Sequence, residues 1–182
     1  MIINESPKDY SGCEITSYSL VSGPEDDEII FYIGKSLVEC ARLEHVLKQI
    51  YAYKITTNEI SFRDAFLEIE RKGRGLSAYA DALKEIAVDQ EIKALLSEIA
   101  NFSDLRNNLA HGVLARTKNN YVLVRSKAEK KPDRLDQFLY PICLSELQIF
   151  SQKLALYRAA LYAAFKDEMG TSAGVFADKI AS

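Results

Sequence analysis

QEIKALLSEIANFSDLRNNLAHG, residues 90–112, combines a long apolar helical pattern with a polar end, and the predicted fold follows from it. Its apolar residues recur with the 3.6-residue period of an α-helix and share one face. That face contains Ile92, Leu95, Leu96, Ile99 and Phe102. Gly112 follows directly after the periodic pattern, at the position where glycine commonly closes a helix in a left-handed conformation. We therefore expect one amphipathic helix over residues 90–111, ending in a polar segment.

Helical periodicity extends to most of the chain on either side of this stretch. Four other segments show it, at about residues 25–54, 59–71, 76–87 and 145–169. The first of them opens with four acidic residues, which complement the positive end of a helix dipole. The last opens with Ser145-Glu146-Leu147-Gln148, which fits a capping box. These patterns predict an all-α protein.

The pattern changes between the last two helices. Residues 113–117 and 121–125 have the composition of two short strands, and asparagines between them suit a tight turn. Residues 126–143 are polar and contain Pro132 and Pro141, so we expect a loop there. The predicted fold is an up-and-down helical bundle with a small β-hairpin, about residues 113–126, inserted before the last helix.

Length and composition limit the classes of protein that fit this sequence. The chain has 182 residues, 48% hydrophobic and 27% charged, which suits a single globular domain. We expect this domain to cover residues 24–170, between an N-terminal arm over residues 1–23 and a flexible tail over residues 171–182. The net charge of −3 means that any nucleic-acid contact must come from a local basic patch.

The cysteines, histidines and apolar runs lead to further expectations. Three widely spaced cysteines with no C-x-x-C pair argue against a disulfide framework or a zinc site. With two histidines in the chain, we expect no metal and no cofactor. No apolar run is long enough for a membrane span, and residues 1–5 lack the basic and apolar blocks of a signal peptide. We therefore expect a cytoplasmic protein without membrane contact.

Two charged residues fall on apolar helix faces. Glu44 lies in the stripe that contains Cys40 and Leu47, and Arg106 lies on the same side as Ile99. Because an unpaired buried charge is costly, we expect Glu44 and Arg106 to lie close together in the bundle interior. A mainly architectural role for Glu44 is the alternative.

The polar end of the central helix concentrates groups that suit phosphodiester chemistry. Arg106, Asn107, Asn108 and His111 lie within six residues, and both asparagines share the side of the histidine. A guanidinium matches phosphate geometry, and an imidazole transfers protons near neutral pH. The alternative is a histidine that only interacts with the helix terminus.

The segment Arg106–His111 also resembles the arginine-to-histidine motif of the HEPN superfamily (higher eukaryote and prokaryote nucleotide-binding domains). Gly112 after the histidine is common in bacterial members, and residues 37–44 are similar to the long first helix of the family. The likeness covers about residues 26–169.

This resemblance implies a helical bundle that dimerises and joins two motifs in one cleft. Many HEPN proteins are metal-independent ribonucleases in toxin–antitoxin, phage-defence or RNA-processing systems, whereas others are non-catalytic binding modules. Carried over, Arg106 would hold the scissile phosphate, His111 would be the acid/base, and Asn107 would assist, with Glu44 and Asn108 in support. A homodimer, an RNA substrate and an antitoxin or regulatory partner protein follow as expectations.

One position departs from the family pattern. Toxins paired with a nucleotidyltransferase antitoxin usually have a tyrosine two residues after the histidine, where this chain has Val113. This difference argues against a nucleotidyltransferase partner.

A basic segment follows the motif. Residues 116–134 contain seven basic residues against two acidic ones. We expect RNA contacts from Arg116, Lys118, Arg125, Lys127, Lys130 and Lys131. The alternative is a solvated hairpin. Three functions therefore stay open: a HEPN-type endoribonuclease, a HEPN-like module that binds protein or nucleic acid without catalysis, and a bundle-type regulator whose interface is the long first or last helix.

Overall fold

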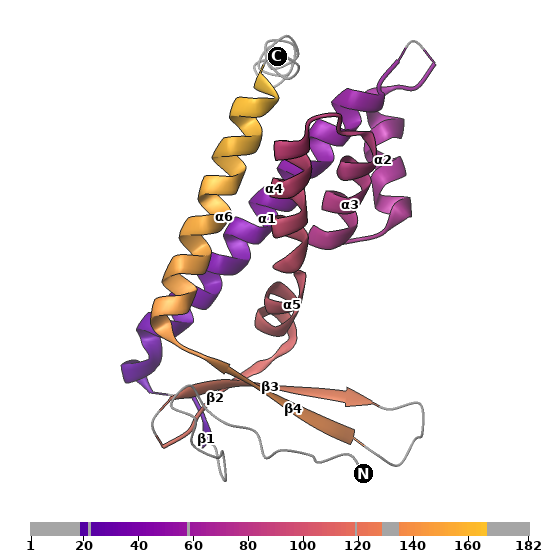
Figure 1. Ribbon diagram of the computed structural model, residues 1–182. Helices are drawn as coiled ribbons and strands as arrows, with labels where there is room; N and C mark the ends of the chain where they lie inside the picture. Colours follow the sequence, from indigo (N-terminus) through magenta and orange to yellow (C-terminus); the bar gives the residue numbers. More distant parts are fainter. Residues whose placement is uncertain (1–18, 22, 58, 119, 129–134, 167–182) are drawn as a thin grey trace, which may run out of the picture. The chain divides into compact units, whose positions relative to one another are not determined.

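A computed structural model of the chain describes residues 19–21, 23–57, 59–118, 120–128 and 135–166 (Figure 1). These residues are mostly helical, with a small antiparallel sheet, so the predicted helical class is confirmed. The elements are β1 (Ser19–Leu20), a 3-10 turn η1 (Pro24–Asp26), α1 (Asp27–Ile55), α2 (Phe62–Lys72), α3 (Leu76–Ile86), α4 (Gln90–Asn101), α5 (Ser103–His111), β2 (Val113–Arg116), β3 (Tyr121–Ala128), β4 (Leu135–Ile142) and α6 (Leu144–Ala164). None of the helices in the described ranges is long and apolar enough to cross a membrane.

The chain forms two compact units, each assembled from two separate stretches of sequence. The sheet unit contains the described residues up to 37 together with 104–151, that is, the sheet, α5 and the first turns of α1 and α6. The helical unit contains residues 38–103 and the described residues from 152 onward. Most of the expected N-terminal arm and all of the expected tail lie outside the described residues.

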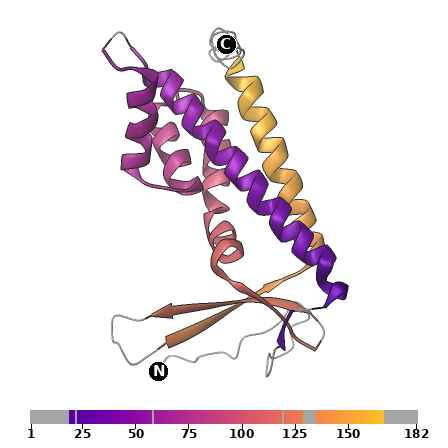
Figure 2. The same cartoon turned by 180° about the vertical axis from the view of Figure 1, so that it is seen from behind.

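The sheet of the sheet unit has the strand order β1-β2-β3-β4, with every neighbouring pair antiparallel. Figures 1 and 2 show β2, β3 and β4 side by side. Strand β2 pairs with β3, with Val113 opposite Val124. Ala115, Val122 and Val124 form a buried apolar cluster on this sheet, with Leu139 of β4 packed against it.

The prediction of a loop over residues 126–143 is wrong, because β4 occupies Leu135–Ile142 and pairs along the whole of β3. Pro141 lies opposite Val122 within this strand. Proline has no N–H for a sheet ladder, but β4 is the last strand in the order and needs donors on one side only. The edge position therefore explains why a strand contains this proline.

The predicted single helix over residues 90–111 is two helices, because α4 ends at Asn101 and α5 begins at Ser103. Between them, the N–H of Phe102 donates to the carbonyl of Ile99, which tightens the last turn of α4. Ser103 and Asp104 follow, and their short polar side chains favour helix starts over helix interiors.

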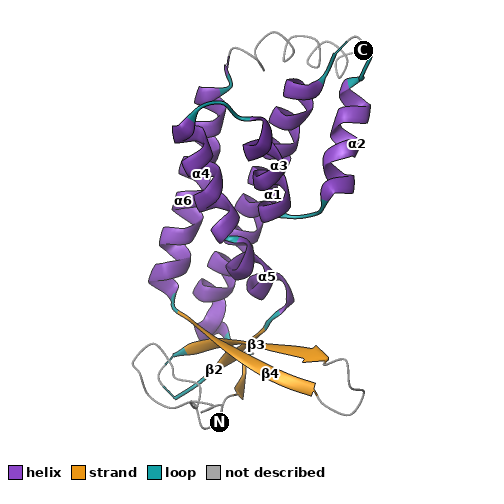
Figure 3. Cartoon of the chain, turned by 45° about the vertical axis from the view of Figure 1, so that its right-hand side comes forward, coloured by secondary structure: helices purple, strands orange, loops and turns teal. Residues whose placement is uncertain are grey.

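The helical unit has a core made by every one of its helices. Two helix starts are capped as the sequence chemistry requires: the Ser61 hydroxyl accepts from the N–H of Asp64, and the Asp89 carboxylate accepts from the N–H groups of Glu91 and Ile92. Helix α3 packs beside α2 and α4 (Figure 3). The largest fully buried side chains of the helical unit are Leu43, Leu47, Ile50, Tyr51, Ile69, Leu76, Leu83, Leu96, Ile99 and Leu154.

Candidate active site

The candidate site lies at the C-terminal end of α5. There, the backbone at Gly112 packs closely against the last turn of α5 and against β3. The N–H of Gly112 donates to the carbonyl of Asn108 at 2.7 Å. A Cβ on Gly112 would lie 2.6 Å from that carbonyl oxygen and 3.0 Å from the Cβ of Leu123 in β3. Gly112 directly follows the last residue of α5, as expected, but its backbone is not left-handed, since Gly75 is the one described glycine in that region. Lack of space, not backbone conformation, is therefore the reason for glycine at this position.

Asn108 connects the helix end to the sheet. It is 7% exposed, and its Oδ1 accepts a hydrogen bond of 3.0 Å from Nη1 of Arg125 in β3. A buried amide without a partner would be costly, so this bond both satisfies Asn108 and places α5 against β3. The sequence placed Asn108 in a supporting role and Arg125 among the RNA-binding residues, and the structure brings these two side chains together.

The remaining motif residues lie toward the surface of the sheet unit. Arg106 and Asn107 are half-buried, and Nη1 of Arg106 donates to Oδ1 of Asn107 at 3.3 Å. His111 is the last residue of α5 and is exposed. The imidazole is thus accessible, and the helix turn that carries it is tied to the sheet through Asn108.

Helix α5 carries two side chains of the kind that phosphodiester cleavage can use, Arg106 and His111. An accessible imidazole can accept or donate a proton, and a guanidinium on the same short helix can neutralise a phosphate oxygen. The amide of Asn107 orients the guanidinium from one side. Among the residues that the structure describes, no three His, Cys, Asp or Glu side chains gather as a metal ion would need.

The basic residues after the motif have different environments. Lys118 is exposed in the connection between β2 and β3, whereas Lys127 is in β3 opposite Asp136. Lys130 and Lys131 lie outside the described residues. Arg125 bonds to Asn108, as described above. The expected RNA contacts of these residues stay predictions.

Arg116 belongs to a partly buried cluster that the sequence did not reveal. Its guanidinium bonds to Asp26, which is buried, and lies 3.3 Å from Glu25. The hydroxyl of Tyr121 also donates to Asp26, at 2.8 Å. Burial alone raises the pKa of Asp26, but the hydrogen bonds from Arg116 and Tyr121 and the charge of Arg116 outweigh it, so the pKa lies below its ordinary value. Arg116 therefore fastens the start of α1 to β2 and β3.

The expected pair of Glu44 and Arg106 joins residues of different units and stays a prediction. Glu44 is half-buried in α1 of the helical unit. The nearly buried charge in this part of α1 is instead Glu39, which bonds to Arg42 at 2.7 Å and to Arg158 of α6 at 3.1 Å. The i,i+3 spacing of Glu39 and Arg42 was a visible signal, whereas nothing in the sequence pointed to Arg158.

Comparison with known proteins found no match: no family model, no curated protein and no solved structure is significantly similar to this chain.

Proposed function

We propose that this protein is a HEPN-type, metal-independent endoribonuclease that acts as a homodimer. The observation that carries the proposal is the exposure of His111 on a helix turn held in place by the bond between Asn108 and Arg125. A catalytic imidazole must be both reachable and positioned. His111 is exposed, and the helix turn that carries it is tied to β3 through Asn108, which supports the proposal. We further propose that the helices form an up-and-down bundle and that the protein acts in the cytoplasm. Its setting would be a toxin or phage-defence system with a regulatory partner protein.

The chemistry explains why two copies are needed. The 2′-hydroxyl of RNA attacks the adjacent phosphorus while the bond from phosphorus to the 5′-oxygen breaks. A base takes the proton of the hydroxyl and an acid protonates the leaving 5′-oxygen. One motif supplies one histidine, so two copies of His111 provide both groups. Arg106 from each copy neutralises the charge that develops on the phosphate oxygens.

A non-catalytic binding module is the second candidate, and a specific observation favours it. Asn108 and Arg125 use their polar groups on each other, so part of the motif region serves the fold. In that case Arg106 and His111 contribute to stability or to partner binding, and their loss changes no reaction.

The test is an RNA cleavage assay on the purified full-length chain in the presence of a chelator. We expect cleavage by the wild type and a loss of roughly 10²–10⁴-fold in His111→Ala, the range for a general acid–base group. Arg106→Ala should lose at least as much, because charge stabilisation of the phosphate goes with it.

Two matched variants serve as controls. His45→Ala removes the other histidine of the chain, which is exposed on α1, and Arg71→Ala removes an exposed arginine at the end of α2. Both should cleave at the wild-type rate. Equal cleavage by the wild type and His111→Ala would refute the assignment, and no cleavage by any of them would favour the binding module.

A further inference from the structure

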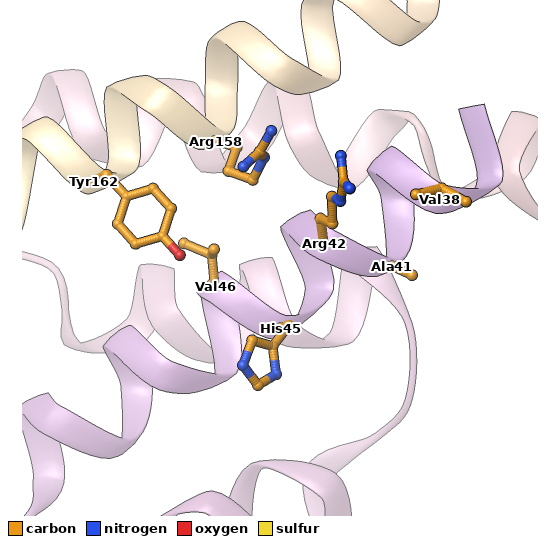
Figure 4. Close-up of a pocket in the computed structure, with 7 residues that line it drawn as sticks. All are labelled: Val38, Ala41, Arg42, His45, Val46, Arg158 and Tyr162. Atoms are coloured by element: carbon orange, nitrogen blue, oxygen red, sulfur yellow. The ribbon is translucent and has the colours of Figure 1, made fainter. Parts of the chain in front are cut away.

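A groove of about 420 Å³ in the helical unit, between α1 and α6, has no part in the proposed nuclease site (Figure 4). Val38, Ala41 and Val46 of α1 and the ring of Tyr162 from α6 give it an apolar wall. Arg42 and Arg158 bring two guanidiniums to the same groove. We propose that this groove binds a small aromatic carboxylate.

The charge balance of the groove favours a monoanion. The carboxylate of Glu39 is 10% exposed and bonds to Arg42 at 2.7 Å and to Arg158 at 3.1 Å. His45 of α1 also lines the groove. The two guanidiniums and the carboxylate of Glu39 leave one net positive charge, to which the imidazole of His45 adds no negative charge. A ligand carboxylate matches this charge, whereas a phosphate dianion exceeds it.

The two guanidiniums are held in place and still have donors for a ligand. Each carries five N–H groups, and Glu39 accepts from one nitrogen of each. The side chain of Arg42 is 57% exposed and that of Arg158 is 30% exposed, so a ligand can reach both. The planar donor fork of arginine pairs well with a carboxylate. Because Glu39 already orders both side chains, binding costs less conformational entropy.

The apolar wall favours an aromatic body on the ligand. Val38 and Tyr162 are both exposed, although their apolar surfaces lie beside charged groups. Figure 4 shows Tyr162 and Arg158 coming from α6 toward the α1 residues. A flat ring beside Tyr162 and Val46, which lie next to each other in Figure 4, would cover this apolar surface and stack without a hydrogen-bond requirement. The volume lies within the range of pockets for small molecules.

The experiment is a titration of the full-length chain with 2-naphthoate, followed by the fluorescence of the ligand. The chain contains no tryptophan, so naphthalene emission is measured with little protein background. Three other probes separate the contributions: 2-naphthalenemethanol has the ring without the charge, acetate has the charge without the ring, and 2-naphthyl phosphate has a dianionic head. Calorimetry measures acetate, which does not fluoresce.

We expect saturable binding of 2-naphthoate and weaker binding of the three other probes. Arg42→Ala should weaken binding by about tenfold or more, since one charge-assisted hydrogen bond is lost. Tyr162→Ala should weaken it by a similar factor through the loss of the aromatic surface. Both residues are exposed, so neither change should unfold the chain.

Two control variants match these changes in type. Arg71→Ala removes an exposed arginine of α2, and Leu156→Ala removes an exposed apolar residue of α6, both outside the groove. They should bind as the wild type does. Naphthoate binding that persists in Arg42→Ala and Tyr162→Ala, or absent binding in the wild type, would overturn the proposal. Tighter binding of 2-naphthyl phosphate would overturn the carboxylate assignment. RNA cleavage by these variants should stay unchanged, so this test is independent of the nuclease proposal.

Discussion

Two regions of the molecule satisfy buried polar groups in different ways: the end of α5 in the sheet unit, and the Glu39 group in the helical unit. The Glu39 group consists of Glu39, Arg42 and Arg158. Both place polar side chains at the edge of an apolar core. In the sheet unit, a neutral buried amide, Asn108, accepts from Arg125 and leaves His111 exposed. In the helical unit, a nearly buried carboxylate is held by two arginines that also line a groove.

The difference determines which groups in each region stay free to meet a substrate or a ligand. The buried amide of Asn108 is neutral and accepts from one half-buried arginine, Arg125, and the same helix ends at the exposed His111. A buried carboxylate instead requires cations, and their surplus charge creates a place for an anion. The first arrangement suits proton transfer and the second suits binding. Substitutions in each of the two regions separate these roles.

Breaking the Glu39 group should cost the most stability. We expect Arg158→Ala to lower the free energy of unfolding by about 2–3 kcal/mol, because the nearly buried Glu39 loses one of its two cations. Arg42→Ala removes the more exposed partner and should cost less than about 1 kcal/mol. Urea denaturation measures both, and Arg158→Met keeps the apolar stem of the side chain as a control. Equal losses for Arg158→Ala and Arg42→Ala would contradict this account.

The close backbone approach at the end of α5 should produce the next effect. Gly112→Ala is expected to destabilise the chain by about 1–3 kcal/mol, since the new Cβ meets a carbonyl oxygen and a β3 side chain. Gly34→Ala is the control, because its Cβ would meet nothing within 4 Å inside α1. That change should stabilise by about 0.5–1 kcal/mol. Thermal unfolding of the two variants should shift in opposite directions; a shift in the same direction would refute the steric argument.

The two asparagines of the motif should differ. Asn108→Ala should cost about 1–2 kcal/mol, since Arg125 loses its acceptor and a buried side chain is removed. Asn107→Ala, at a half-buried position, should change stability by less than about 0.5 kcal/mol. Chemical denaturation measures this ordering, and the reverse ordering would mean that Asn108 does not anchor α5.

Acid should weaken the cluster around Asp26, the buried carboxylate of the sheet unit. The folded-state pKa of Asp26 is lowered, so its contribution to stability is present above the unfolded pKa of about 3.9 and is lost as pH falls through the folded value. Denaturation curves between pH 7 and acid should therefore show a steeper loss for the wild type than for Asp26→Asn. Parallel curves would mean that the bonds to Arg116 and Tyr121 contribute nothing.

Local patterns predicted much of the fold. Apolar periodicity predicted α2 and α3 within a few residues of their observed bounds, and the composition of residues 113–117 and 121–125 indicated strands. Local patterns failed where contacts with residues distant in the sequence determine the secondary structure. Strand β4 contains Pro141, which is tolerated because the strand is at the sheet edge. The apolar period runs without interruption to Phe102, so it did not predict that α4 ends there. The break depends on the polar residues that follow Phe102.

The candidate site was predictable only in its local part. The spacing of Arg106, Asn107 and His111 within one short helix is visible in the sequence, whereas the partner of Asn108 comes from another strand. The Glu39 group was missed for the same reason, since Arg158 is 119 positions away. Periodicity predicts which face of a helix is buried, but not which distant charge meets it.

The most direct test of the central claim, that His111 performs proton transfer in RNA cleavage, is the chemistry of the product ends. With the full-length chain, chelator and a defined RNA, mass spectrometry of the fragments identifies those ends. The account predicts 2′,3′-cyclic phosphate and 5′-hydroxyl ends from the wild type, absent with His111→Ala and present with His45→Ala. Ends of 5′-phosphate and 3′-hydroxyl, or identical fragments from the wild type and His111→Ala, would contradict it.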